Sequence, residues 1–292
     1  MSAPSKPDPS HIRNVSDTAH WVAMYRAMET DRRDALFRDP YARRLAGPRG
    51  EAIVRTLPRA RAMAWAMIVR TAVMDEIILR AVNRDGVRTV ANLAAGLDAR
   101  PWRLDLPMKL TWLDVDLPDI QQYKRDALQG EKPQCNLEWV PADLANADAR
   151  RSVMAKVAAC PGPGLVITEG LLIYLEREQV MALATDLAAT PNLRWWLIDI
   201  ASPGLLKMMG RTWGKGVSQS APFKFAPEED TAFFEPAGWK EVEYRSMFEE
   251  SLRLKRTMRF ARFWKFVGRF YPKKMQEKFK RFSGIVLMER RR

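Results

Sequence analysis

The sequence is poor in cysteine and histidine. Its 292 residues include two of each. Cys135 and Cys160 cannot supply the several disulfides that hold small secreted scaffolds together. His11 and His20 are the only imidazoles, so the chain also lacks the ligand pairs of a structural zinc site. Both scarcities exclude a cross-linked or zinc-centred fold and favour a reducing compartment.

Long apolar runs and phosphate-binding glycine motifs are also missing. No stretch reaches the ~18 uninterrupted apolar residues of a membrane-spanning helix, and the N-terminal MSAPSKPDPSHIRN has no signal-peptide core. We therefore expect a cytoplasmic protein. The absence of G-x-G-x-x-G argues against a nicotinamide or flavin dinucleotide, because no pyrophosphate cradle is present.

The composition is that of a globular protein, with 47% apolar and 10% aromatic residues. Residues 1–14 are rich in proline, serine and charge, which predicts a disordered tail. The rest, 15–292, is predicted to be one domain. Within it we expect N-terminal helices at 15–86, a cofactor-binding core at 87–202, a cap at 203–230, and C-terminal strands with a basic helix at 231–292.

Strands alternate with helices after Gly86, which predicts a doubly wound, mostly parallel sheet of class α/β. Two more strands near the end of the chain predict an antiparallel addition at one edge, giving seven strands. They are expected at VRTVANLA, LTWLDVD, LEWVPAD, LVITEG, RWWLIDIAS, WKEVEYRSM and SGIVLMERR. Upstream, helices are expected from Asp17 to about Gly47 and from about Arg59 to Asn83.

A glycine turn and an acidic residue mark the predicted ligand site. The first strand ends at Ala95-Gly96, where a backbone can approach a ligand closely, and the second ends in Asp114-Val115-Asp116. An acid about 20 residues after the glycine turn can accept both hydroxyl hydrogens of an adenosine ribose. Adenosine without a pyrophosphate indicates S-adenosylmethionine, although a purely structural turn remains an alternative.

The motifs NLAAGLDARPWRLDLP, WLDVDLPDIQQYKRDAL, VPADL and TEGLLIYLE together resemble the leucine carboxyl methyltransferase-like family of class I S-adenosylmethionine-dependent O-methyltransferases, which includes bacterial polyketide O-methyltransferases. The likeness covers about residues 15–290. It implies a seven-stranded Rossmann-like sheet and a methyl transfer that leaves S-adenosylhomocysteine and needs no metal. It also implies a small-molecule acceptor resembling a natural product.

The resemblance assigns roles to individual residues. Arg70 would pair with the cofactor's carboxylate, Gly96 would lie beside its methionyl part, and Asp116 rather than Asp114 would bind the ribose. By the same resemblance, Asp143 and Leu144 would lie beside the adenine. Glu169 would lie near the sulfonium, and Tyr174 would stand where the acceptor pocket begins.

Each role has a structural alternative. Arg70 can be an exposed arginine, Asp143 a helix N-cap, Glu169 a solvated strand end, and Tyr174 a packing residue. Asp98 can cap its turn or reach the methionyl end, whereas Arg100 and Trp102 can be a solvated arginine and a packed tryptophan. Three cap aromatics line either the acceptor pocket or the core of the cap: Trp213, Phe223 and Phe225.

The choice of acceptor depends on a base. A carboxylate is already ionised at neutral pH, whereas an alcohol or phenol benefits from proton removal. His11 falls in the predicted tail and His20 in a helix, so the sequence offers poor bases. Carboxyl methylation is compatible with this scarcity, but hydroxyl methylation stays open.

The C-terminal end is strongly basic. The net charge is +13, and residues 251–292 carry 15 basic and two acidic residues. Within this segment, residues 259–271 read RFARFWKFVGRFY, with Pro272 following. A helix here would place Arg262, Lys265 and Arg269 opposite an aromatic face made by Phe260, Phe263, Trp264, Val267, Phe270 and Tyr271. Such a helix can pack on the domain, cover the pocket or bind a membrane surface peripherally.

The sequence also bears on two other functions. Methylation of nucleic-acid bases commonly uses an N/D-P-P-Y/F motif after the fourth strand or a catalytic cysteine after proline. Here TEGLLIY occupies that place and Cys160 precedes a proline, so nucleic acid is disfavoured. The other alternative is a non-catalytic or membrane-associated binding protein on a methyltransferase scaffold, with the basic tail as its working surface.

Overall fold

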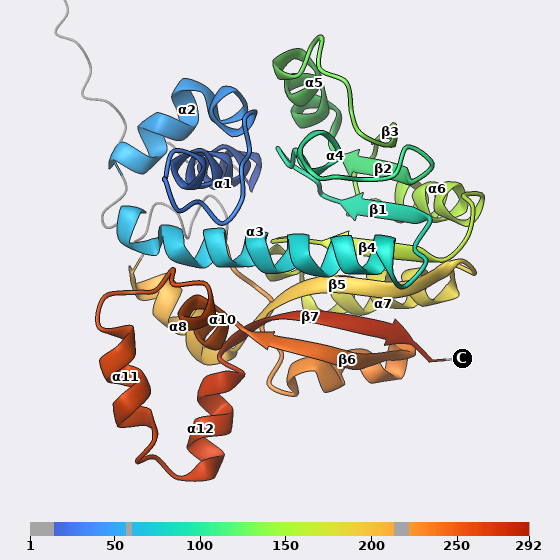
Figure 1. Ribbon diagram of the computed structural model, residues 1–292. Coiled ribbons are helices and arrows are strands. Elements are labelled where there is room, and N and C mark those ends of the chain that lie inside the picture. The colour runs from blue at the N-terminus through green and yellow to red at the C-terminus, as the bar shows by residue number, and fades with distance from the viewer. Residues whose placement is uncertain (1–14, 57–59, 213–221, 292) are drawn as a thin grey trace, which may run out of the picture.

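A seven-stranded sheet forms the centre of the computed structural model, which describes residues 15–56, 60–212 and 222–291 (Figure 1). The strand order is β3-β2-β1-β4-β5-β7-β6. β1 to β5 are parallel, and β7 pairs antiparallel with both β5 and β6. The strands span Thr89–Leu93 (β1), Thr111–Asp116 (β2), Asn136–Pro141 (β3), Gly164–Thr168 (β4), Leu193–Ala201 (β5), Trp239–Ser246 (β6) and Ser283–Arg290 (β7). The predicted fold class is confirmed.

Helices cover both faces of the sheet. The long helix α3 (Ala60–Asn83) crosses one face, and α6 (Ala147–Ala158) and α7 (Arg177–Ala189) cover the other (Figure 1). β1 and β4 are buried along their whole length, as expected for central strands between two helical layers. The remaining helices are α1 (Val15–Thr30), α2 (Ala42–Thr56), α4 (Arg100–Arg103), α5 (Pro118–Ala127), η1 (Leu172–Tyr174), α8 (Pro203–Thr212), η2 (Asp230–Ala237), α10 (Met247–Arg253), α11 (Ala261–Gly268) and α12 (Lys273–Lys280).

Local sequence signals explain several helix starts. Pro118 occupies the first turn of α5, where a missing N–H costs nothing. Asn146 caps α6 by accepting from the N–H groups of Asp148 and Ala149. Glu176 and Gln179 form a reciprocal capping box at the start of α7. These signals place the starts of the three helices shortly after the ends of β2, β3 and β4.

Four sequence expectations need correction. The helix predicted from Asp17 to Gly47 is two helices, because α1 ends at Thr30 and α2 begins at Ala42. The cap predicted as irregular at 203–230 begins with the regular helix α8. The single basic helix is two, α11 and α12, with Pro272 as the N-cap residue of the second. Asp143 does not cap α6, since Asn146 does. The predicted tail at 1–14, with His11, lies outside the described residues.

Candidate functional site

A cavity of about 1680 Å³ opens at the carboxyl ends of the parallel strands. It is lined by the residues that follow β1, β2, β3 and β4 and by the end of β5. Ligands of doubly wound sheets bind at this edge. All seven sequence-predicted site residues line this one cavity: Arg70, Gly96, Asp116, Asp143, Leu144, Glu169 and Tyr174.

The turn after β1 is built for close approach of a ligand. Ala94 and Gly96 both have left-handed backbone conformations, with φ of 53° and 52°. A Cβ at Gly96 would lie 3.2 Å from the Cβ of Ala19, so a larger residue would crowd α1 as well as strain the turn. Ala95 and Gly96 therefore form a tight turn of small residues that borders the cavity and leaves space beside the backbone.

Asp116 holds this turn in place. Its Oδ2 accepts from the N–H of Gly96 at 2.5 Å and its Oδ1 from the N–H of Leu117 at 2.7 Å. Burial raises the pKa of Asp116, and these two backbone hydrogen bonds oppose the rise. Each carboxylate oxygen has a further lone pair, so the side chain can still accept from two hydroxyl groups in the cavity.

Asp114, the other acid of the second strand, has a different role. It is fully buried, and its Oδ2 lies 2.6 Å from Nζ of Lys124 on α5. Burial raises the pKa of Asp114 to about 6, although the lysine opposes this. Asp114 does not line the cavity. Of the two acids only Asp116 borders the cavity, and its role as the ribose ligand stays a prediction.

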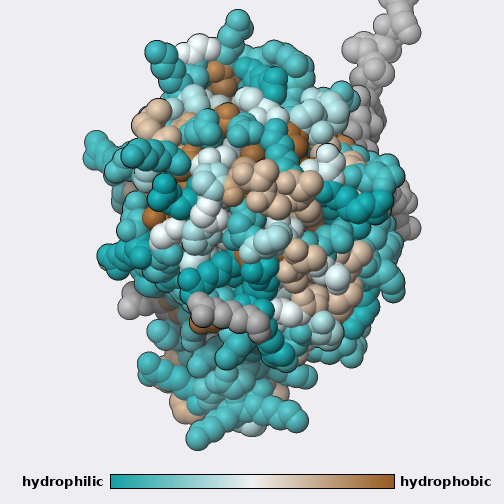
Figure 2. Space-filling model, turned by 90° about the vertical axis from the view of Figure 1, so that its right-hand side faces the viewer, coloured by the Kyte–Doolittle hydropathy of each residue, from teal (hydrophilic) through white to brown (hydrophobic). Residues whose placement is uncertain are grey.

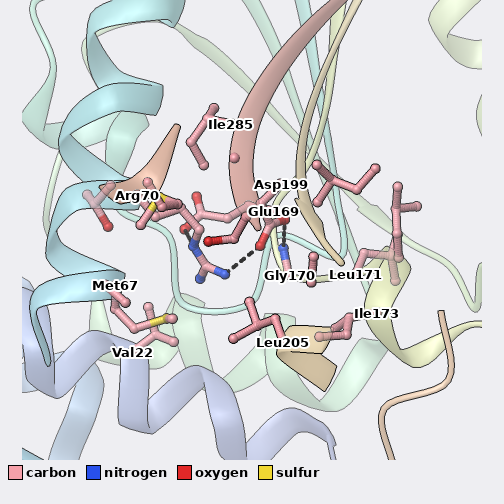
Figure 3. Close-up of a pocket in the computed structure, with 18 of the residues that line it drawn as sticks. Val22, Met67, Arg70, Glu169, Gly170, Leu171, Ile173, Asp199, Leu205 and Ile285 are labelled. Carbon is pink, nitrogen blue, oxygen red and sulfur yellow. Dashed lines mark hydrogen bonds and ion pairs between the residues drawn. The ribbon is translucent and has the colours of Figure 1, made fainter. Parts of the chain in front are cut away.

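Arg70 projects from α3 into the cavity between two carboxylates (Figure 3). Its Nε lies 2.9 Å from Oε1 of Glu169 as an ion pair without hydrogen-bond geometry, and its Nη1 donates to Oδ2 of Asp199 at 2.9 Å. Its Nη2 forms no hydrogen bond with any described residue and can donate to a ligand carboxylate. Burial alone would lower the pKa of Arg70, but Glu169 and Asp199 offset this and leave it raised. Arg70, with 11% of its side chain exposed, is therefore a largely enclosed cation rather than an exposed surface arginine.

Glu169 is not a solvated strand end. Besides Arg70, it accepts from Nη1 of Arg100 at 2.7 Å. Burial raises the pKa of Glu169, but the two arginines outweigh it and the pKa is lowered. Its carboxylate stays ionised and is a weak base, as suits a group beside a cationic ligand.

Asp199 and Arg100 belong to the ion-pair network beside the cavity, although the sequence assigned no such role to either. Asp199, near the end of β5, accepts from the N–H of Gly170 at 2.7 Å as well as from Arg70 (Figure 3). Arg100 is buried, at 2% exposure, so its interpretation as a solvated arginine was wrong. It binds Asp75 and Asp98 in addition to Glu169, with distances of 2.7 and 2.9 Å. An acid that interrupts the apolar end of a strand was the available signal for Asp199, as it was for Glu169.

The remaining predicted residues border the cavity in different ways. Asp143 is exposed and uses Oδ1 to accept from the N–H of Ala145 at 2.9 Å, while Leu144 is half-buried beside it. Asp98 caps its own turn by accepting from the N–H of Arg100 at 2.9 Å. Trp102 is a packing residue, buried with its ring 5.8 Å from that of Trp139.

Apolar side chains predominate in the remainder of the cavity. Val22, Met67 and Leu205 face the space around Arg70 (Figure 3). Phe223 and Phe225 also line the cavity, and Phe225 packs on Phe233 and Phe234 in the hydrophobic core on the α6 and α7 side of the sheet. Trp213 lies outside the described residues. The cavity extends to Trp264, Tyr271 and Phe279 of α11, α12 and the turn between them.

Tyr174 lies between the polar and apolar parts. Its ring is 5.7 Å from that of Phe223, and its hydroxyl borders the cavity near Thr18 and Arg70. Burial raises the pKa of Tyr174, with Thr18 and Arg70 acting in the other direction. The phenol therefore stays protonated at neutral pH, with Thr18 as a hydrogen-bond partner.

Two solved structures share this fold with the chain. A DUF574 family protein of Streptomyces avermitilis has the same fold, with a TM-score of 0.57 at 12% identity over 92% of this chain and 97% of that one. A protein described as "a putative methyltransferase" of Thermobifida fusca matches with a TM-score of 0.54 at 12% identity over all of both chains.

The sequence relatives give the family. A Streptomyces avermitilis protein named "Putative S-adenosyl-L-methionine-dependent methyltransferase" is 28% identical over 76% of this chain and 82% of its own. A Mycolicibacterium gilvum protein of the same name is 35% identical, with 68% and 69% covered. The leucine carboxyl methyltransferase family model matches residues 19–188. The chain belongs to that family, and its cofactor is S-adenosylmethionine.

Proposed function

We propose that the protein methylates an oxygen of an apolar small molecule, with a carboxylate as the preferred acceptor and a hydroxyl as the second choice. The size and the lining of the cavity give the main support for this proposal. Its 1680 Å³ exceeds the roughly 300–1,000 Å³ of a pocket for one ligand. The polar part suits the cofactor, and the apolar part leaves room for a sizeable acceptor.

When bound, the cofactor supplies a methyl group already activated by its sulfonium. In the proposed site Arg70 and Asp116 hold its two ends, and Glu169 offers negative charge beside its cationic part. Tyr174 then orients the acceptor through its hydroxyl group. The apolar lining around Leu205 and Phe223 excludes water from the reacting groups.

The available bases favour a carboxylate acceptor. The Nδ1 of His20 lies 3.0 Å from the carbonyl of Ala46, burial lowers its pKa, and its side chain does not line the cavity. Glu169 is held by two arginines. Lys265 and Arg269, both exposed, also border the cavity and add positive charge there. This charge attracts an anionic acceptor.

The proposal is tested with paired acceptors. Purified protein with S-adenosylmethionine is offered apolar carboxylic acids and the alcohols of the same carbon skeleton, and products are identified by mass. A methyl ester releases methanol in mild alkali, whereas an ether does not. Esters from the acids, with no product from the alcohols, are expected. Failure to bind S-adenosylhomocysteine in calorimetry would instead support the non-catalytic scaffold.

The variant Tyr174→Phe tests whether the hydroxyl of Tyr174 orients the acceptor or whether the ring only packs. One neutral hydrogen bond contributes about 0.5–1.5 kcal/mol, so turnover should fall roughly 2- to 12-fold with little change in cofactor affinity. Unchanged turnover would show that Tyr174 only packs.

A further inference from the structure

Residues 258–282, here called the hairpin, project from the body of the protein (Figure 1). They comprise α11, α12 and the turn between them. The turn is held internally: Tyr271 stacks on Phe279 at 5.6 Å, and Nε2 of Gln276 donates to the carbonyl of Tyr271 at 2.8 Å. The hairpin is therefore an ordered element with its own contacts.

One side of α11 and the following turn carries phenylalanines that face water. Phe263, Phe266 and Phe270 are 58%, 57% and 75% exposed. Their spacing of three and four residues places them along one face. None of the three lines the cavity. Soluble surfaces rarely expose several large apolar side chains together without a partner.

Positive charge surrounds these rings. Six basic side chains of the hairpin are exposed and form no ion pair with any described residue: Arg259, Lys265, Arg269, Lys273, Lys274 and Lys278. The acid of the hairpin, Glu277, pairs with Lys280 at 3.4 Å. The hairpin forms the lobe at the bottom of Figure 2, where hydrophilic residues surround a few hydrophobic ones on the visible face. The chain's net positive charge is thus concentrated beside its exposed aromatics.

We propose that the hairpin docks the protein on an anionic lipid bilayer, with the three phenylalanines in the headgroup region and the lysines and arginines on lipid phosphates. Aromatic rings flanked by basic side chains suit this interface, because the rings enter the apolar boundary while the charges stay at headgroup level. A nucleic-acid duplex would match the charge but would leave the phenylalanine face unburied. In the part of the chain that the structure describes, no helix is long or apolar enough to cross the bilayer, so the contact is peripheral.

The hairpin also borders the cavity, through Trp264, Tyr271 and Phe279. Docking would therefore bring the cavity entrance to the lipid surface, where apolar acceptors accumulate. Binding to lipid rests on the hairpin alone and not on the proposed acceptor, so it is measured separately from turnover.

The test is co-sedimentation of the full chain with vesicles of phosphatidylglycerol and phosphatidylcholine, compared with phosphatidylcholine alone. Two variants remove the proposed contacts without touching the cavity. The aromatic variant combines Phe263→Ala, Phe266→Ala and Phe270→Ala, and the basic variant combines Lys273→Gln, Lys274→Gln and Lys278→Gln. Matched controls outside the hairpin are Met108→Ala, which removes a side chain 71% exposed, and the combination Lys109→Gln, Lys132→Gln and Lys240→Gln.

We expect the natural protein to prefer the anionic vesicles and to be released as salt is raised from about 0.1 to 1 M. The basic variant should bind roughly 100-fold more weakly and the aromatic variant at least about 10-fold more weakly. The controls should match the natural protein, and all variants should keep their affinity for S-adenosylhomocysteine. Equal binding to neutral vesicles, or no binding to either, would overturn the proposal. So would binding to nucleic acid, or self-association through the phenylalanines, in place of vesicle binding.

Discussion

Replacing Asp116 with alanine should weaken S-adenosylhomocysteine binding by roughly 10-fold or more. Each hydrogen bond from a ribose hydroxyl to a charged acceptor is worth about 1.5–3 kcal/mol, and about 1.4 kcal/mol corresponds to a factor of ten. The loss has a second part, because the N–H of Gly96, 2.5 Å from Oδ2, loses its acceptor. The turn that presents the backbone to the ligand then loosens.

Isothermal titration calorimetry on three variants separates these contributions. Asp116→Asn keeps an oxygen for the N–H of Gly96 but removes the charge, so its affinity should lie between those of the natural protein and Asp116→Ala. Asp119→Ala is the matched control, because Asp119 is exposed two residues past the cavity-lining Leu117 and should bind normally. Unchanged affinity in a folded Asp116→Ala protein would show that another group binds the ribose.

The same reasoning gives a pH dependence. The ionised carboxylate of Asp116 accepts hydrogen bonds at both oxygens, whereas the protonated acid accepts them more weakly and uses one oxygen as a donor. Burial raises the pKa of Asp116. Cofactor affinity should therefore begin to fall at a higher pH than an ordinary aspartate would give as the solution is acidified. Asp116→Ala should lack this component.

Two further predictions concern the surroundings of the site. Gly170→Ala should cost about 1–2 kcal/mol of stability because of its left-handed backbone, and its Cβ would lie 3.2 Å from Nη1 of Arg70. Chemical denaturation should show a similar cost in the control Gly130→Ala, whose φ is 85° with open space around it, but only Gly170→Ala should weaken cofactor binding. Lys124→Met should lower the free energy of unfolding by about 3–5 kcal/mol at neutral pH, since Asp114 is left buried and unpaired. In this variant the folded-state pKa of Asp114 is raised above its unfolded value, so stability is lost as pH rises above the unfolded pKa. Urea titrations should therefore show a smaller loss of stability near pH 5 than at neutral pH. An equal loss at both pH values would contradict the role given to Asp114.

Much of the fold was predictable because its signals are local. Short apolar runs that end in an acid or a small residue marked each parallel strand, and β2 and β4 place those acids, Asp116 and Glu169, at the same sheet edge. The order of such elements restricts the topology strongly. The predicted division of the chain into core, cap and C-terminal segment remains a prediction.

The ion-pair network was not predictable because it joins distant parts of the chain. Arg100 meets Asp75 and Glu169, which lie 25 and 69 positions away. A buried arginine and a solvated one look alike in a sequence, since only the partners supplied by the fold distinguish them. Asp199 is a similar case, because its contact with Arg70 spans 129 positions.

The hairpin shows a different limit. A helical pattern across residues 259–271 places aromatics on one face, but it does not reveal that α11 ends at Gly268. It also cannot tell whether that face is buried against the domain. The answer depends on the tertiary position of α11, and the structure leaves Phe263 and Phe270 in solvent.

The position of β7 also affects how the sheet is completed. Among the described residues β6 pairs only with β7. β7 also pairs with β5, whose Trp195–Ile198 stretch is buried. During synthesis β5 emerges long before β7 and has an open, apolar edge in the meantime. Open apolar edges invite pairing between chains. Substitutions that loosen β7 should therefore lower the yield of dispersed protein through aggregation before they alter cofactor affinity.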